Sequence, residues 1–403
     1  MLINQTFEID SCDDVELGIK RTSKLEYRIS YDDEKDLKAI VFVIGGYGAN
    51  ANIYFLDSYR NYIAKNFGVV TINVFYHCFC QRRSDVEKYS TLADFTKDDL
   101  KLIEKVLRKY NIPCDQLANN TVVSYCEYLS EIMTELKMLN RLPYDFEERL
   151  SATFIPPNGD YQNFGIMAAI DHINALKDLV KRFPEFADLP KIYGGGSYGG
   201  YLSLLIAKIA PWYVDGVIDN SGPALPPLQF ILGREIDSPE FVFNSKDLNL
   251  YCFLKTHWTR KENSSYFFND ANYIIRVLLN LKHLQILSDI SKNIIFVTYH
   301  SVKDFQAPVK DKIIFYDIFN TLGFDATLNL IKYESQVDGR FIKDLNHGMR
   351  ISDKALFRKE LPLMLEKLQK RKSLMQENSI SYPCGNKAFT FKDVGDKFVL
   401  KLN

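Results

Sequence analysis

The sequence predicts an α/β fold with a mostly parallel central sheet and helices on both of its faces. Two stretches, Ala39–Ile44 and Asn293–His300, are continuous apolar runs of strand length, which is typical of strands covered on both faces. Between them, Gly195-Gly196-Ser197-Tyr198-Gly199 reads G-x-S-x-G, the pattern of a serine on a sharp turn from a buried strand to a helix. Strands, glycine turns and helices therefore alternate along the chain.

The composition indicates a globular protein large enough to bury a sizeable core. Of its 403 residues 46% are hydrophobic and 25% charged, which is ordinary for such proteins, and the length favours one large domain with insertions. Lysine and arginine number 50 against 51 aspartates and glutamates. A net charge of −1 predicts neither nucleic acid nor an anionic membrane as a partner.

The start of the chain and its cysteines indicate a cytoplasmic protein. The first 10 residues lack the basic start, long apolar run and cleavage site of a secretion signal, and no apolar run reaches the roughly 18 residues of a membrane helix. Seven scattered cysteines favour reduced thiols. Cys78 and Cys80 have the wrong spacing for zinc, so we expect no metal and no other cofactor.

The first part of the core is predicted over residues 1–77. Gln5–Ile9 and Leu25–Tyr31 alternate enough to form two antiparallel strands at a sheet edge. The buried strand Ala39–Ile44 ends in Gly45-Gly46-Tyr47-Gly48, where outward-pointing N–H groups could meet a developing oxyanion. A plain strand-to-helix turn is the alternative. A helix and a second buried strand follow, at Ile53–Lys65 and Gly68–Tyr76.

Two insertions interrupt the predicted core. Residues 78–158 carry charged helical stretches but no strand of the buried kind, which predicts a helical cap; these stretches are Leu92–Lys109 and Val122–Leu139. Residues 223–291 form a second cap rich in aromatic side chains, which could line an acceptor pocket, although most aromatic residues simply pack. Residues 371–403 form a tail that reads as a β-hairpin with a turn near Gly395.

The core resumes over residues 159–222 and 292–370. An amphipathic helix over Tyr161–Arg182 leads to the Ser197 strand, and a strand from Val214 follows the serine helix. The remaining predicted elements are a helix, a strand and a helix that Pro362 should kink or split, at Val309–Leu322, Ala326–Tyr333 and Asp353–Lys370.

A serine nucleophile needs a histidine base and a carboxylate that orients this histidine, and in folds of this kind the chain order is Ser, Asp, His. Of the six histidines only His300 and His347 lie in the expected C-terminal part. His347 follows the final strand, whereas His300 precedes any acid loop, so His347 is the predicted base. Asp304, in the loop after a buried strand, is the predicted acid. The alternatives are Asp219, then Asp338 and Asp344.

The oxyanion of the reaction needs N–H donors beside the serine. The residue after the nucleophile normally supplies one of them, which here is Tyr198. A second N–H would come from Gly46 or Tyr47, and the Tyr47 hydroxyl is a further candidate donor.

These motifs carry a family resemblance. They are Gly-Gly-Tyr-Gly, Gly-Gly-Gly-Ser-Tyr-Gly-Gly, His-Ser-Val-Lys-Asp-Phe-Gln-Ala-Pro and Asn-His-Gly. Together they resemble the α/β-hydrolase superfamily, above all its prolyl-oligopeptidase-like peptidases and acyl esterases, over about Ala39–Lys370 without the insertions. The resemblance implies Ser197, Asp304 and His347 as the triad. Ala307 replaces a common valine and no propeller domain precedes the core, which argues against large peptides as substrates.

The whole chain also resembles the bacterial "domain of unknown function 2920" family. That resemblance implies a role in acyl modification of a nonulosonic-acid type sugar, linked to flagellin glycosylation. The predicted substrate is therefore a small-molecule or sugar ester.

Three enzymatic interpretations and one without catalysis remain. The residues favour a serine hydrolase that cleaves an ester through an acyl-enzyme. An acyltransferase would use the same triad and pass the acyl group to an acceptor sugar, which is favoured if the second insertion excludes water. A peptidase is the third. A binding protein on a hydrolase scaffold would be indicated by a substituted triad, whereas all three residue types are present here.

Overall fold

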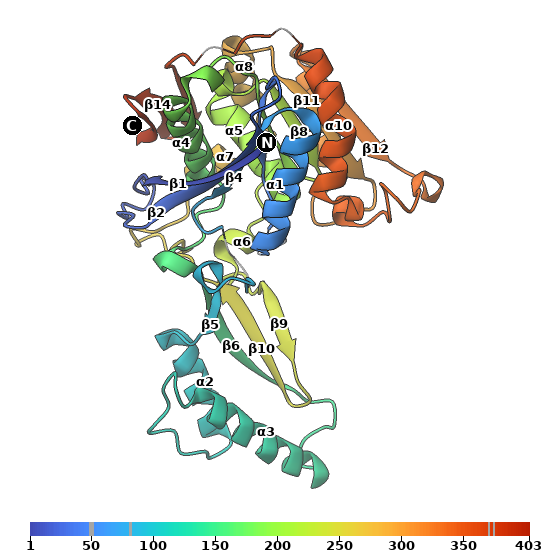
Figure 1. Ribbon diagram of the computed structural model, residues 1–403. Coiled ribbons are helices and arrows are strands. Elements are labelled where there is room, and N and C mark those ends of the chain that lie inside the picture. Colours follow the sequence, from blue (N-terminus) through green and yellow to red (C-terminus); the bar gives the residue numbers. More distant parts are fainter. Residues whose placement is uncertain (48–51, 80–82, 370, 374) are drawn as a thin grey trace.

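An eight-stranded sheet in the order β1-β2-β4-β3-β7-β8-β11-β12 forms the centre of the molecule (Figure 1). The computed structural model describes residues 1–47, 52–79, 83–369, 371–373 and 375–403. The strands of this sheet are β1 (Leu2–Asp10), β2 (Lys24–Asp32), β3 (Ile40–Val43), β4 (Val70–Phe75), β7 (Lys191–Gly196), β8 (Gly216–Asn220), β11 (Ile295–Ser301) and β12 (Asp325–Ile331).

Strand β2 runs antiparallel to both of its neighbours, and the six strands from β4 to β12 are parallel to one another. This strand order, with its single reversed strand near one edge, is that of the α/β-hydrolase fold. The predicted fold class and the antiparallel edge pair are therefore confirmed.

Helices cover both faces of the sheet, because side chains of its central strands point alternately to two apolar cores. In β3, Ile40 and Phe42 belong to one core, and Val41 and Val43 to the other. Two helices cover the Val41 face, namely α1 (Ile53–Phe67) and α10 (Asp353–Lys367). The Phe42 face is covered by α4 (Ile166–Arg182), α5 (Tyr198–Ile209), α8 (Leu281–Ile290) and α9 (Val309–Thr321).

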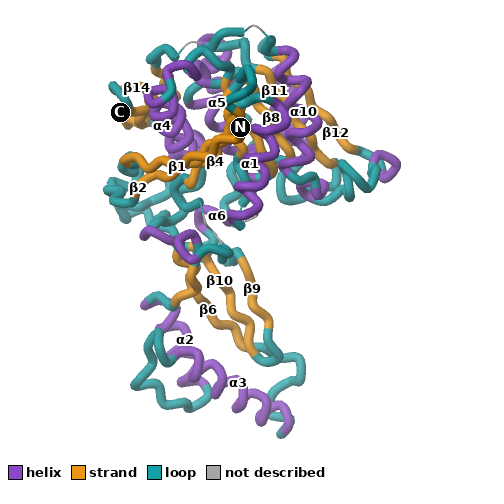
Figure 2. Tube along the Cα trace, viewed as in Figure 1, coloured by secondary structure: helices purple, strands orange, loops and turns teal. Residues whose placement is uncertain are grey.

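The two insertions together build one projecting lobe with a sheet of its own (Figures 1 and 2). Its strands, in the order β5-β6-β10-β9, are β5 (Leu92–Asp94), β6 (Glu148–Ile155), β9 (Phe241–Asn244) and β10 (Leu248–Leu254). Its helices are α2 (Lys97–Lys109) and α3 (Val122–Met138). The expectation that residues 78–158 lack a buried strand is wrong, because Leu150–Thr153 of β6 are buried. Residues 92–94, expected to be helical, pair with β6 instead.

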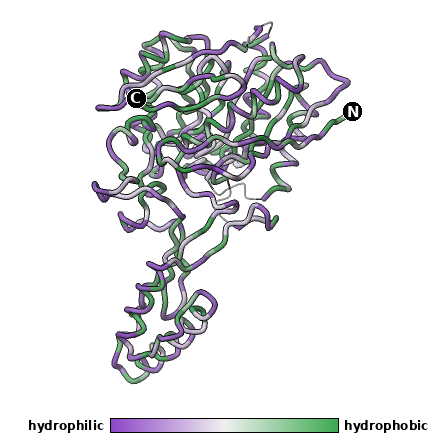
Figure 3. Tube along the Cα trace, turned by 90° about the vertical axis from the view of Figure 1, so that its left-hand side faces the viewer, coloured by the Kyte–Doolittle hydropathy of each residue, from purple (hydrophilic) through white to green (hydrophobic). Residues whose placement is uncertain are grey.

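The lobe has a small apolar core between its helices and its sheet. This core includes Ile103 and Leu107 of α2, Leu129 and Met133 of α3, and Leu150 of β6. In the perpendicular view of Figure 3 the lobe again extends away from the main body. It leaves the main body after β4 and after β8, and both of these parallel strands end at the same edge of the sheet as β7.

The last part of the chain differs from its prediction in two details. The hairpin between β14 (Lys387–Val394) and β15 (Lys397–Leu402) turns near Gly395 as expected, and β13 (Ser379–Cys384) adds a third strand. Helix α10 runs unbroken from Asp353 to Lys367 with Pro362 inside it, so the expected split is absent, and a kink at Pro362 stays a prediction. The two remaining helices are α6 (Gln229–Leu232) and α7 (Asp270–Arg276).

Two other predictions concern the cysteines and the membrane. The six described cysteines are free thiols, and Cys80 lies outside the described residues. Among the described residues, every helix is too short or too polar to span a membrane.

Candidate active site

Ser197 occupies the sharp turn between β7 and α5. Its backbone has φ 54° and ψ −118°, a conformation that a residue with a side chain adopts only where the surrounding structure enforces it. Gly195 and Gly199 allow the turn, because a Cβ atom on either would lie 1.8 or 1.9 Å from the carbonyl oxygen of Ile44. The glycines of the motif thus permit β3 and the turn to approach closely, and the serine is held at the carboxyl end of β7.

The structure brings the three predicted side chains together. His347 Nε2 lies 2.7 Å from Ser197 Oγ, and His347 Nδ1 lies 2.8 and 3.0 Å from the two carboxylate oxygens of Asp304. The Asp304 side chain is fully buried, whereas 15% of the His347 side chain is exposed. Hydrogen bonds of these lengths join a serine, a histidine and a carboxylate in the arrangement that activates a serine hydroxyl.

Asp304 is held as a carboxylate by its surroundings. Its Oδ1 accepts the backbone N–H groups of Gln306 and Ala307, each at 3.0 Å. Burial by itself would raise the pKa of Asp304, but the hydrogen bond and charge of His347 and the N–H of Ala307 bring this pKa below its ordinary value. The acid therefore stays ionised and can orient the imidazole.

His300, rejected as the base, lies behind the acid. It is buried, and its Nε2 lies 2.8 Å from the carbonyl oxygen of Ala307 and 3.5 Å from Asp304 Oδ2. Because a carbonyl only accepts, Nε2 carries the proton. Burial and the nearby Lys312 lower the pKa of His300, so its imidazole is neutral. Its hydrogen bond to the carbonyl oxygen of Ala307 holds the loop that carries Asp304.

Three polar side chains that the sequence reasoning missed hold the loop of His347. Asn220 Nδ2 donates to the carbonyl oxygen of Gly348 at 3.0 Å, and Gly348 N–H donates to Ser221 Oγ at 3.2 Å. Ser301 Oγ donates to the carbonyl oxygen of Leu345 at 2.6 Å. All three follow or end the parallel strands β8 and β11, and this position at the carboxyl edge of the sheet is the signal that could have found them.

The alternative acids have other partners. Asp219 is buried and accepts from Lys312 Nζ at 2.7 Å, Thr298 Oγ1 at 2.6 Å and Gly222 N–H at 2.8 Å. Asp338 and Asp344 accept backbone N–H groups of their own loop. Of the four aspartates, Asp304 is the one that lies within hydrogen-bond distance of His347.

The predicted oxyanion donors lie around the sharp turn at Ser197, here called the elbow. One of them, the Tyr47 hydroxyl, has another partner. Tyr198 is the first residue of α5, where backbone N–H groups have no partner within the helix, and Gly46 and Tyr47 follow β3. The Tyr47 hydroxyl, a candidate donor from the sequence, donates to Glu240 instead. The backbone role of Gly46 or Tyr47 stays a prediction, and Gly48 lies outside the described residues.

The aromatic side chains of the second insertion divide between the site and the core. Phe230 stacks on Tyr47 with ring centroids 4.3 Å apart. Trp258 and Phe268 instead pack over the guanidinium of Arg276, at 5.5 and 5.7 Å. Trp258 and Phe268 therefore belong to the packed interior, and the idea that aromatics of this insertion line an acceptor pocket stays a prediction.

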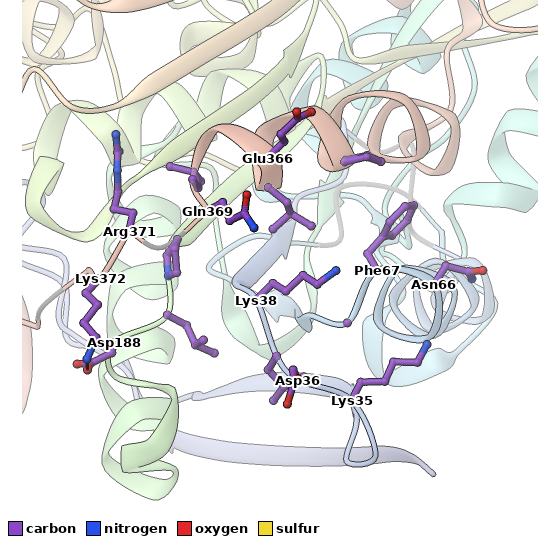
Figure 4. A pocket seen from close by; sticks show the side chains of 17 residues that line it. Lys35, Asp36, Lys38, Asn66, Phe67, Asp188, Glu366, Gln369, Arg371 and Lys372 are labelled. Atoms are coloured by element: carbon purple, nitrogen blue, oxygen red, sulfur yellow. Dashed lines mark ion pairs between the residues drawn. The ribbon is translucent and has the colours of Figure 1, made fainter.

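A surface cavity lies at the other edge of the sheet. It measures about 1130 Å³, and Figure 4 shows Lys38, Asp188, Arg371 and their neighbours around it. Lys38, Gly68 and Pro190 precede β3, β4 and β7, so this cavity faces the amino ends of the strands, whereas Ser197 follows the carboxyl end of β7.

Within the described parts of the chain, no three histidine, cysteine or acidic side chains form a group able to hold a metal ion.

Solved structures with a similar backbone come from hydrolases. The chain is 13% identical to the Pyrococcus horikoshii acylaminoacyl peptidase, covering 94% of this chain and 43% of that one, with a TM-score of 0.44. It is 11% identical to Thermogutta terrifontis esterase 2, covering 91% and 93%, with a TM-score of 0.40. A ferulic acid esterase is 9% identical, covering 91% and 98%, with a TM-score of 0.42.

These likenesses are too remote to transfer an activity. The chain spans less than half of the acylaminoacyl peptidase, and no curated protein matches the sequence. A family model does match: the one described as "Protein of unknown function (DUF2920)" covers residues 5–402, and the chain belongs to this family.

Proposed function

We propose that this protein is a serine hydrolase that cleaves carboxylic esters through an acyl-enzyme. The observation that carries the proposal is the continuous chain of hydrogen bonds from Ser197 Oγ through His347 to Asp304. A serine hydroxyl is a weak nucleophile at neutral pH, and a histidine within hydrogen-bond reach removes its proton as it attacks.

In this mechanism Ser197 Oγ attacks the ester carbonyl while His347 Nε2 accepts the serine proton. Asp304 holds the Nδ1 proton and stabilises the imidazolium that forms. The carbonyl oxygen becomes an oxyanion, which the N–H of Tyr198 and an N–H of Gly46 or Tyr47 would stabilise. His347 then protonates the leaving alkoxide, and a water activated by the same histidine releases the acid.

The acyltransferase remains the second candidate, and the position of the lobe favours it. The lobe leaves the sheet after β4 and β8, at the edge where Ser197 follows β7, and Phe230 stacks on Tyr47 of the loop after β3. A second insertion that excludes water from Ser197 would favour an organic acceptor over hydrolysis. A sugar ester substrate and a link to a flagellin glycan are parts of this proposal that rest on the family resemblance, and a cytoplasmic location is a part that rests on the scattered cysteines. Cleavage of short peptide amides is the outcome that would indicate a peptidase.

Labelling with a fluorophosphonate probe tests the proposal. We expect one adduct on Ser197, absent in Ser197→Ala, while both proteins keep the same circular dichroism. Ser203→Ala is the matched control, since Ser203 lies on α5 with its hydroxyl bonded to the carbonyl oxygen of Gly199. No adduct on the wild-type protein, under conditions that label a known serine hydrolase, contradicts the proposal.

A substrate panel then separates the reactions. Short p-nitrophenyl esters, O-acetylated sugars and peptide amides are compared with and without a sugar acceptor. Release of free acid indicates hydrolysis, acylated acceptor indicates transfer, and amide cleavage indicates a peptidase.

A further inference from the structure

Tyr47 is the point at which the lobe contacts the loop beside the catalytic serine. Its hydroxyl donates to Glu240 and lies 3.5 Å from Gln162 Nε2. Its ring stacks on Phe230, with centroids 4.3 Å apart, and meets the edge of Tyr198 at 5.6 Å. One side chain of the glycine loop is thus held by the elbow on one side and by the base of the lobe on the other.

The residues that hold Tyr47 are themselves attached to the lobe sheet. Glu240 directly precedes β9, and its N–H donates to the carbonyl oxygen of Cys252 in β10 at 2.8 Å. The N–H of Gln162 donates to the carbonyl oxygen of Lys255, just after β10, also at 2.8 Å. Backbone hydrogen bonds therefore fix Glu240 and Gln162, which contact Tyr47, to the lobe sheet.

We propose that Glu240 and Tyr47 are positioning residues through which the lobe aligns the oxyanion loop for catalysis. This inference rests on the proposed serine hydrolase function. The peptide that follows Gly45-Gly46 has the conformational freedom of glycine, and a glycine loop without an anchor orders its N–H groups poorly. An oxyanion donor acts only when it is held at hydrogen-bond distance from the developing charge, so the anchor at Tyr47 affects the rate rather than substrate binding.

Under this proposal the two insertions share a task that neither has alone. Phe230 and Glu240 come from the second insertion, whereas Gln162 lies four residues after the end of the first. The lobe sheet is completed only when β6 of one insertion pairs with β10 of the other. An oxyanion loop anchored in this way is aligned only after both insertions have folded onto each other.

Steady-state kinetics with p-nitrophenyl acetate test the inference in three variants. Glu240→Leu removes the acceptor, Tyr47→Phe removes the donor, and Glu240→Gln keeps an acceptor oxygen. We expect the first two to lower kcat about 10- to 100-fold, less than the loss of a whole oxyanion donor, with KM changed less than about twofold. Glu240→Gln should recover most of the lost kcat. Affinity for a trifluoromethyl ketone, which forms an oxyanion on Ser197, should fall by the same factor as kcat.

Asp237→Asn is the matched control, because Asp237 lies in the same segment but pairs with Arg149 of the lobe. It should leave kcat and KM unchanged. Unchanged kcat in Glu240→Leu and Tyr47→Phe, or an effect on KM alone, overturns the inference, as does equal loss in Asp237→Asn. These outcomes differ from failure of the proposed function, in which the wild-type protein itself would neither be labelled by a fluorophosphonate nor turn over.

Discussion

Replacing Asp304 by asparagine should lower kcat, because the contacts of its two carboxylate oxygens decide how the new amide is oriented. Oδ1 accepts both loop N–H groups, from Gln306 and Ala307 at 3.0 Å, and Oδ2 lies 2.8 Å from His347 Nδ1. In Asp304→Asn the amide oxygen must stay with the two N–H donors, so the NH₂ group takes the place of Oδ2. An amide NH₂ only donates, so His347 Nδ1 must accept at the shorter, 2.8 Å contact. The amide oxygen also lies 3.0 Å from Nδ1, but its two loop N–H donors already occupy it.

This change reverses the tautomer of the imidazole. The remaining proton moves to Nε2, which lies 2.7 Å from Ser197 Oγ and can no longer accept the serine proton. The same change in a serine protease triad lowers kcat about 10⁴-fold, equivalent to about 5.5 kcal/mol of the barrier. We therefore expect Asp304→Asn to lose about 10⁴ in kcat while its thermal midpoint changes little, since both backbone hydrogen bonds remain.

The assay is turnover of p-nitrophenyl acetate together with the rate of fluorophosphonate labelling. Asp338→Asn is the matched control, because Asp338 also accepts loop N–H groups, from Arg340, Phe341 and Ile342, but is remote from the triad contacts. A folded Asp304→Asn protein that keeps more than about a tenth of the wild-type kcat would refute the assignment of the acid, since the tautomer effect is expected to cost far more.

Three further predictions concern the elbow, the histidine loop and pH. Gly199→Ala places a Cβ 1.9 Å from the carbonyl oxygen of Ile44, so this variant should give little folded protein by circular dichroism; a normal yield contradicts the packing argument. Asn220→Ala frees the carbonyl oxygen of Gly348 and should lower kcat at least about tenfold; unchanged kinetics contradict its positioning role. Burial lowers the pKa of His172 from 6.5 to about 4, so between these pH values the unfolded chain binds a proton there that the folded chain does not. This residue alone should lower the free energy of unfolding by about 3 kcal/mol as the pH falls from 6.5 to 4, and His172→Phe should remove that share of the slope in urea unfolding; an unchanged slope contradicts the burial argument.

Much of the core could be predicted because local patterns and a rule of chain order applied to it. Continuous apolar runs marked β3 and β11, and the spacing of glycines around Ser197 marked a turn that few other residues permit. Elimination among six histidines then left His347, and the structure places it beside Ser197 and Asp304. The catalytic roles stay predictions, but the meeting of these side chains follows from the parallel strands, whose carboxyl ends share one edge.

The lobe was predicted less well, because its order depends on a contact between distant segments. Residues 248–254 pair in parallel with residues 148–155, and no local pattern identifies such a partner. Strand β6 begins with Glu148 and Arg149, so its polar start resembles the charged helices around it. Short runs of this kind are ambiguous between helix and strand until their neighbours are known, and here the neighbour lies about a hundred residues away in the sequence.

The contacts that hold the site could not be predicted for the same reason, because they join residues that are far apart in the sequence. Asn220 and Ser221 are ordinary polar residues after a strand, and only the fold brings Gly348 to them. Tyr47 and Glu240 meet because both insertions leave the core at the carboxyl ends of β4 and β8, next to the end of β7. A lobe attached at this edge cannot shift at its base without moving a side chain that contacts the elbow. The sequence therefore predicts which groups would react, whereas their alignment depends on segments that meet only in the folded chain.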